Sequence, residues 1–116
     1  MEQERLEVEV KVFRGRPVVS AAGELDTWTA DTFREAVDGV LREKPKCVIV
    51  DLSKVSYMDS GALQVLVRAC RELNADGKVY AIANGIPERL IRTAGLDRLV
   101  ALLSKLEQVC TIADES

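Results

Sequence analysis

The chain has 116 residues, of which 47% are hydrophobic and 30% are charged, and this composition is typical of one globular domain spanning residues 1–116. The net charge of −3 argues against the clustered positive surface that binds nucleic acid, so we expect a protein or a small molecule as the partner. The sequence contains no histidine, which removes the Ser-His-Asp arrangement, the usual general base and the commonest metal ligand, so we expect neither an enzyme nor a metal site.

Export and membrane insertion are not expected either. Residues 1–5 are polar, whereas a secretory signal has a positively charged and then an apolar segment, and no apolar run approaches the roughly 20 residues that span a bilayer. Three cysteines, Cys47, Cys70 and Cys110, form no C-x-x-C pair and fall on apolar faces, which is typical of buried, reduced thiols. These features predict a cytoplasmic protein.

The first two predicted strands form a hairpin. Residues 6–12 alternate between apolar and charged side chains, which predicts a strand with one buried and one solvated face. A turn at residues 15–17 leads to a second apolar run over residues 18–22, and so short a link implies antiparallel pairing. Apolar residues at helical spacing then predict a helix that begins at Thr29 as its N-cap and ends before Pro45.

Strands and helices alternate through the middle of the chain. Residues 47–51 form a short, mostly β-branched run, which predicts a buried strand, followed by a loop over residues 52–58. From Leu63 onward apolar residues recur at helical spacing, which predicts a second helix that ends near residues 74–77. A strand over residues 78–83 is expected to follow it. This alternation predicts that the strands pair in parallel.

The last third of the chain has a weaker pattern. Pro87 fits the first turn of a third helix, and Gly95 fits the left-handed residue that ends it. Residues 98–103 could form an edge strand and residues 106–113 a last helix, but the periodicity of short apolar runs does not settle either. The chain therefore predicts an α/β fold with a mixed sheet of four to five strands, an N-terminal hairpin, mainly parallel remaining strands and three to four helices.

Ser60 is the candidate switch residue. It lies at the predicted start of the second helix, in the segment Tyr57-Met58-Asp59-Ser60-Gly61. Backbone N–H groups at a helix start lack intrahelical partners and carry the positive end of the peptide dipoles, so a phosphate on Ser60 would be favoured there. Asp59 is expected to be the N-cap, and the alternative role for Ser60 is that of an ordinary helix-start residue.

Two segments together resemble the STAS domain family, whose typical members are anti-sigma-factor antagonists. They are Gly23-Glu24-Leu25-Asp26-Thr27-Trp28-Thr29-Ala30, after the second predicted strand, and Asp51-Leu52-Ser53 through Asp59-Ser60-Gly61, after the third. The resemblance extends over nearly the whole chain. It implies a STAS-like mixed sheet with helices that acts as a phosphorylation-gated protein ligand and not as a catalyst.

The resemblance also implies partners and residue roles. The unphosphorylated protein would bind an anti-sigma factor that is itself a serine protein kinase and so free the sigma factor, and phosphorylation of Ser60 would release the antagonist. Asp26 matches an aspartate at the partner surface. A phosphatase as a further partner and a homodimer stay open. The expected partner-binding residues are Asp26, Thr27, Trp28, Asp59, Ser60, Gly61 and Ala62.

Gly61 and Ala62 depart from the family pattern, which mostly has Ser or Thr and then Gly at these positions. Family members that vary around the serine often serve as scaffolds or as regulatory subunits of transport machines. This departure keeps an alternative function open, namely a constitutive scaffold or a regulatory subunit of a stress-signalling or lipid/anion-transport complex.

Other residues in these segments have alternative interpretations. The role of Asp26 could be limited to bracing the turn after its strand. Trp28 could be an exposed anchor, although a lid on the core is preferred.

Asp51 invites comparison with phospho-accepting receivers, but no acidic pair follows the first strand to hold Mg²⁺, so we expect a local bond to the loop over residues 52–58. Neither glycine-rich nucleotide motif occurs, so no cofactor is predicted.

Overall fold

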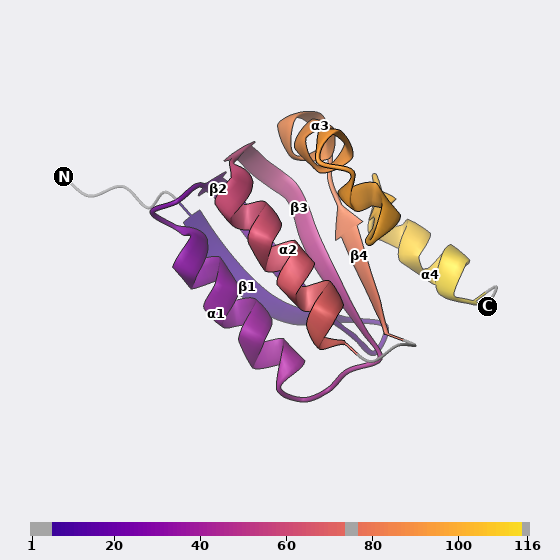
Figure 1. Ribbon diagram of the computed structural model, residues 1–116. Helices are drawn as coiled ribbons and strands as arrows, with labels where there is room; N and C mark the ends of the chain where they lie inside the picture. The colour runs from indigo at the N-terminus through magenta and orange to yellow at the C-terminus, as the bar shows by residue number, and fades with distance from the viewer. Residues whose placement is uncertain (1–5, 74–76, 115–116) are drawn as a thin grey trace.

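Five strands form one mixed sheet in the order β1-β2-β3-β4-β5 (Figure 1). The computed structural model describes residues 6–73 and 77–114. β1 pairs antiparallel with β2, and each later pair of neighbours is parallel, which confirms the predicted hairpin and parallel remainder and settles the last run as an edge strand. The strands are β1 (Leu6–Phe13), β2 (Arg16–Leu25), β3 (Cys47–Met58), β4 (Lys78–Ile82) and β5 (Ala101–Leu103).

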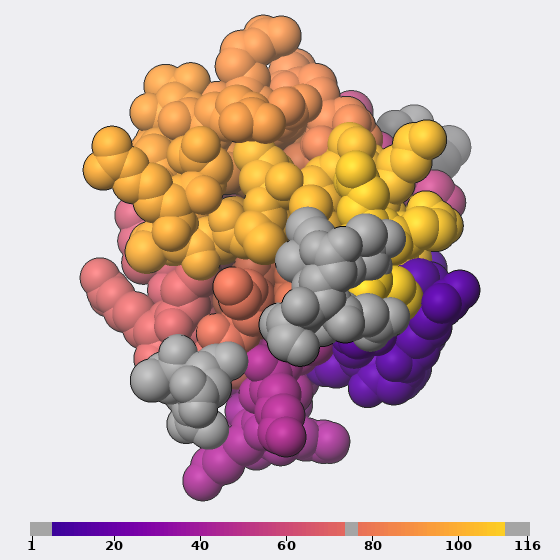
Figure 2. Space-filling view, turned by 90° about the vertical axis from the view of Figure 1, so that its right-hand side faces the viewer, coloured from indigo at the N-terminus to yellow at the C-terminus, as the bar shows by residue number. Residues whose placement is uncertain are grey.

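Helices cover both faces of the sheet. One face carries α1 (Ala30–Leu41), α2 (Ser60–Glu72) and α3 (Gly85–Thr93), whose apolar side chains share one core with β2 and β3. The other face carries α4 (Glu107–Asp114). Figure 2 shows the orange and yellow C-terminal segments, which include α3 and α4, covering the side of the molecule next to β4.

The central strand β3 supplies side chains to two cores. Val48 and Val50 point into the larger core, which Phe33 fills from α1. Ile49 points the other way, into a smaller core that Val109 of α4 closes. Because β3 is buried on both faces, its first half is a continuous apolar run and not an alternation of apolar and polar residues.

β3 is longer than predicted. It runs on through the expected loop and has 12 residues. Its second half stays paired with β2 across two register shifts, each of which adds one residue to β3. The buried side chains there are Leu52, Val55 and Met58, three residues apart, because the shifts break the alternation of the strand. A spacing of three does not indicate a strand, and for this reason the prediction of a loop over residues 52–58 is wrong.

The remaining boundaries lie closer to the predictions. β2 extends beyond its predicted end to Leu25, because it follows β3 to the edge of the sheet. α2 ends at Glu72, and part of its predicted end near residues 74–77 falls on residues 74–76, which lie outside the described residues. Gly95 has φ +77°, which confirms the left-handed stop after α3, and α4 confirms the last helix.

Replacement of Leu52 tests the extended strand. Leu52 is 1% exposed in the larger core, so Leu52→Ala should lower the free energy of unfolding by about 2–5 kcal/mol, the usual range for a buried leucine. The adjacent Ser53 is exposed, and Ser53→Ala should change the same quantity by less than about 0.5 kcal/mol. Denaturant unfolding followed by circular dichroism measures both. Two equally small effects would show that Leu52 lies in a solvated loop.

Candidate partner-binding site

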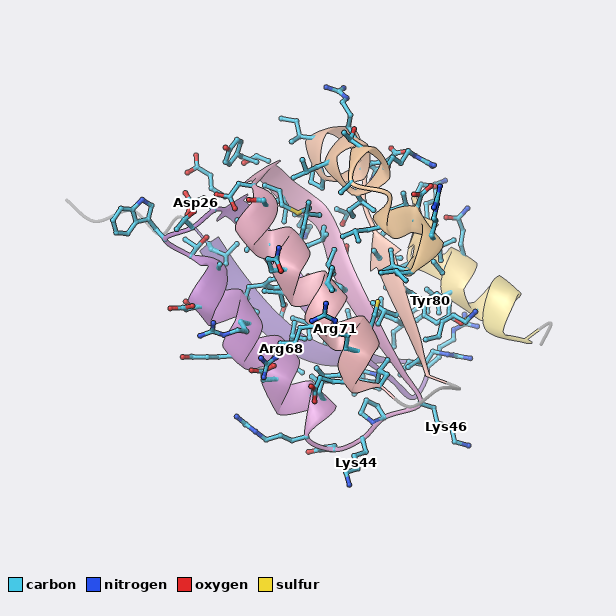
Figure 3. All side chains as sticks on the ribbon, viewed as in Figure 1. Asp26, Lys44, Lys46, Arg68, Arg71 and Tyr80 are labelled. Atoms are coloured by element: carbon cyan, nitrogen blue, oxygen red, sulfur yellow. The ribbon has the colours of Figure 1, made fainter. Side chains whose placement is uncertain are left out.

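The carboxyl ends of β2, β3 and β4 lie at one edge of the sheet, because these strands run parallel. α1, α2 and α3 each begin just beyond one of these ends. Figure 3 shows Asp26 at this edge, near the start of α1. Open sheets of this kind bind their ligands beyond the carboxyl ends of the strands, so this edge is the candidate site.

Asp59 links two of the loops at this edge. Its Oδ1 accepts the N–H of Gly61 at 2.9 Å, which confirms Asp59 as the N-cap of α2. Its Oδ2 accepts the N–H of Thr27 at 3.0 Å and the hydroxyl of Thr27 at 3.2 Å. The Asp59 N–H donates to the carbonyl of Leu25 at 3.2 Å. One carboxylate therefore fixes the start of α2 against the loop that leads from β2 into α1.

Asp26 closes that loop from within. Its Oδ1 accepts the N–H groups of Trp28 at 2.9 Å and Thr29 at 3.1 Å. In return, the Thr29 hydroxyl accepts the Asp26 N–H at 2.9 Å and donates to the Glu24 carbonyl at 2.9 Å. Thr29 holds the predicted N-cap position of α1, but its hydroxyl closes the loop and does not cap the helix. Asp26 therefore braces the turn, and its contact with a partner stays a prediction.

Ser60 is the first residue of α2, and its side chain is exposed. The next two N–H groups already have partners, because Gly61 donates to the Asp59 carboxylate and Ala62 donates to the Asp59 carbonyl at 3.2 Å. These two groups are therefore not available to a phosphate, and phosphorylation of Ser60 stays a prediction.

Gly61 and Ala62 have structural roles at the start of α2. A Cβ on Gly61 would lie 3.2 Å from Asp59 Oδ1 and 3.8 Å from the Cβ of Ala30, so the glycine leaves the space that the capping carboxylate occupies. The side chain of Ala62 is fully buried in the larger core. The prediction that Ala62 contacts a partner is wrong for its side chain, because the helical turn directs it inward.

Trp28 is 83% exposed, so the preferred interpretation as a lid on the core is wrong. Leu25 and Phe33, on either side of the turn, are fully buried and already fill the core at this place. The turn closed by Asp26 holds Trp28 outside the core. Trp28 is therefore an exposed side chain, and its role as an anchor for a partner stays a prediction.

Two further exposed apolar residues at this edge are absent from the sequence prediction. Tyr57 is 47% exposed near the end of β3, and Ile86 is 45% exposed in the first turn of α3. The signal for Tyr57 is its position next to the buried Met58, which directs it outward once the strand is known to extend this far. We call Thr27, Trp28, Tyr57, Ser60 and Ile86 the strand-end surface.

Several features outside this edge have structural explanations. Asp51 Oδ1 accepts the N–H of Ser53 at 3.0 Å, so the expected local bond is confirmed, although it lies within β3. All three cysteines are free, but only Cys110 is buried, so the expectation of buried thiols is wrong for Cys47 and Cys70, which are half-buried. Desolvation by this partial burial raises the pKa of Cys47 and of Cys70. Within residues 6–73 and 77–114 no three potential metal ligands gather. None of the helices described there has the length and apolar character that spanning a membrane requires.

The sequence matches known proteins over most of its length. A family model described as the STAS domain matches residues 7–109. The chain is 31% identical over 105 residues to the anti-sigma-F factor antagonist RsfB of Mycobacterium tuberculosis, and this match covers 90% of this chain and 86% of that protein. It is also 34% identical over 85 residues to an anti-sigma-B factor antagonist of Staphylococcus epidermidis, and this match covers 73% of this chain and 78% of that protein.

The fold also matches a solved structure closely. The crystal structure of an anti-sigma factor antagonist from Mycobacterium paratuberculosis has a TM-score of 0.88 and 29% sequence identity. The match covers 92% of each chain.

The link made by Asp59 can be measured. Asp59→Ala should lower the free energy of unfolding by about 1–2 kcal/mol, because it removes the cap of α2 and the bonds to Thr27. The control is Asp31→Ala, in the first turn of α1, where loss of an exposed pair with Arg34 should change it by less than about 0.5 kcal/mol. In a double-mutant cycle, Thr27→Ala should have a smaller effect once Asp59 is replaced, whereas additive effects would contradict the link.

Proposed function

The chain belongs to the STAS domain family, and from this membership we propose that it is an anti-sigma-factor antagonist that binds an anti-sigma factor through the strand-end surface and so frees a sigma factor. The observation that carries this proposal is the pair of bonds from Asp59 to Thr27, which holds the loop with Trp28 beside the exposed Ser60. The names of the relatives support the same role, because RsfB is an antagonist of an anti-sigma factor.

The side chains of this surface suit a protein partner. Trp28, Tyr57 and Ile86 are large, exposed and apolar, and tryptophan and tyrosine are the side chains that most often dominate binding energy at protein interfaces. The carboxylates of Asp26 and Asp59 lie in the same loops. We therefore expect the partner to offer an apolar pocket for the indole.

Phosphorylation of Ser60 would switch this interaction off. A phosphoserine adds roughly −1.5 to −2 charges, here beside the carboxylate of Asp59. The two anions repel each other, which weakens the bonds from Asp59 to Thr27, and the added charge is unfavourable against an apolar partner surface. The proposed partner is accordingly a serine kinase as well as an anti-sigma factor, and a phosphatase would reset the switch.

The proposed role needs binding and no catalysis by this chain. Its partners act on transcription, which places the protein in the cytoplasm. Within the proposal, residues 1–116 act as one STAS domain, and every step takes place at the same edge of the sheet.

The switch is tested with the anti-sigma factor of the serine-kinase type from the same organism. Incubation with ATP should modify Ser60, as mapped by mass spectrometry, and Ser60→Asp should weaken binding at least about tenfold in calorimetry, or about 1.4 kcal/mol. The control is Ser53→Asp, which adds the same charge at an exposed position on β3, away from α2. Its affinity for the partner should stay within about twofold of the wild type. A complex that persists with ATP while Ser60 stays unmodified would favour a constitutive scaffold.

The anchor is tested separately from the switch. Trp28→Ala should weaken binding of the same partner by about 2 kcal/mol or more, as expected for a central aromatic residue, and leave the free energy of unfolding unchanged because the side chain is exposed. Leu99→Ala is the matched control. Leu99 is also exposed, but it lies just before β5, the outer strand of the sheet, and is not part of the strand-end surface. Equal affinity of both variants and the wild type would exclude the strand-end surface as the docking site.

A further inference from the structure

β1 is the outer strand of the sheet, and among the described residues it pairs only with β2. Its side chains alternate between two faces. Val10 and Val12, on the helix face, are 53% and 71% exposed and line a groove of about 640 Å³ between β1 and α1. Glu9 and Lys11, on the opposite face, are exposed as well. An edge strand with exposed valines is a surface that pairs readily with another strand.

The hairpin turn determines which backbone groups of β1 face outward. Arg14 and Gly15 both have positive φ, +51° and +82°, which identifies a two-residue loop of type I′. The residues that flank such a loop, Phe13 and Arg16, form a hydrogen-bonded pair, and every second pair along the ladder does the same. The N–H and C=O groups between these pairs, at Val8, Val10 and Val12, therefore point to the free edge.

We propose that β1 is the interface of a homodimer, in which β1 of a second copy pairs antiparallel with it across a two-fold axis at Val10. In this register Val10 faces Val10 of the second copy, and Val8 faces Val12. All three outward-pointing residues then form hydrogen-bonded pairs, because residues at even positions lie opposite one another. The proposal is independent of the function assigned to the strand-end surface.

In this register no like charges on β1 face one another. Glu9 lies opposite Lys11 of the second copy, and Lys11 lies opposite Glu9, so the symmetry makes two ion pairs. Both occupy positions without backbone hydrogen bonds, where facing side chains lie closest. A shift of two residues in one direction pairs Glu7 with Lys11 but places Glu9 against Glu9, and a shift in the other direction places Lys11 against Lys11. A shift of one residue sets outward backbone groups against groups already bonded to β2.

The valines and the shape of the sheet favour a closed pair. The exposed side chains of Val10 and Val12 from both copies would form one apolar row on the helix face, beside the groove along α1. The opposite edge of the sheet is β5, which has only three residues, so the assembly offers no second long edge for further growth. The result is a continuous ten-stranded sheet with a closed two-fold axis.

The dimer leaves both partner sites free. The axis is perpendicular to the sheet, so β2 of the second copy runs opposite to β2 of the first. The carboxyl ends of β2 in the two copies consequently point in opposite directions, so the two strand-end surfaces lie on opposite sides of the ten-stranded sheet, at opposite ends of its strands. Neither Thr27 nor Asp59 takes part in the β1 pairing, and the dimer can bind two partner molecules at once.

Charge reversal tests the interface and its register together. Sedimentation velocity of the full chain, up to concentrations of several hundred micromolar, should show a monomer–dimer equilibrium. Glu9→Lys and Lys11→Glu should each raise the dimer dissociation constant at least about tenfold, because each variant places like charges opposite one another. An equimolar mixture of the two variants should form a heterodimer, since the strand with two lysines then faces the strand with two glutamates.

Lys54→Glu is the control, because it makes the same change of charge as Lys11→Glu at an exposed position on β3, away from the edge. It should dimerise like the wild type. At concentrations low enough that every chain is monomeric, the circular dichroism spectrum and the unfolding midpoint should be equal for all variants, since the replaced side chains are exposed. A wild-type chain that stays monomeric at every concentration, variants that dimerise like the wild type, or a mixture that does not associate would each overturn the proposal.

Discussion

The carboxylate of Asp59 makes one surface out of two loops. Its oxygens bond the start of α2 and the loop between β2 and α1, and the N–H of the same residue bonds the end of β2. One short side chain can reach both because the parallel strands β2 and β3 end side by side. Gly61 leaves the space that the carboxylate occupies. This link fixes the loop with Trp28 against the start of the helix with Ser60.

The irregular pairing of β2 with β3 brings Asp59 to that position. Two register shifts insert extra residues into β3, and beyond them Met58 lies opposite Leu25 with both side chains buried. The residue after Met58 is therefore level with the end of β2, within reach of the loop at Thr27. The same shifts turn Tyr57 outward, opposite Glu24. A bulged strand thus supplies both the link and part of the apolar surface.

The sheet presents two surfaces of different chemistry. The strand-end surface presents exposed aromatic and aliphatic side chains, which suits a foreign protein with an apolar pocket. The edge of β1 offers backbone groups in a row and the charge pattern of Glu9 and Lys11, which matches its own copy under two-fold symmetry. The first surface lies on loops and the second on a strand edge, so each stays available when the other is occupied.

Features set by a few neighbouring residues follow from the sequence, and the others need the folded chain. The hairpin, the helix starts at Thr29 and Asp59 and the stop at Gly95 depend on local backbone preferences, which the residue types reveal. The two motifs likewise indicate the family and the candidate site. The length of β3, the exposure of Trp28 and the bond from Asp59 to Thr27, 32 positions away, were decided by the tertiary structure. They depend on strand register and on which side chains already fill the core, and contacts between residues distant in the chain fix both.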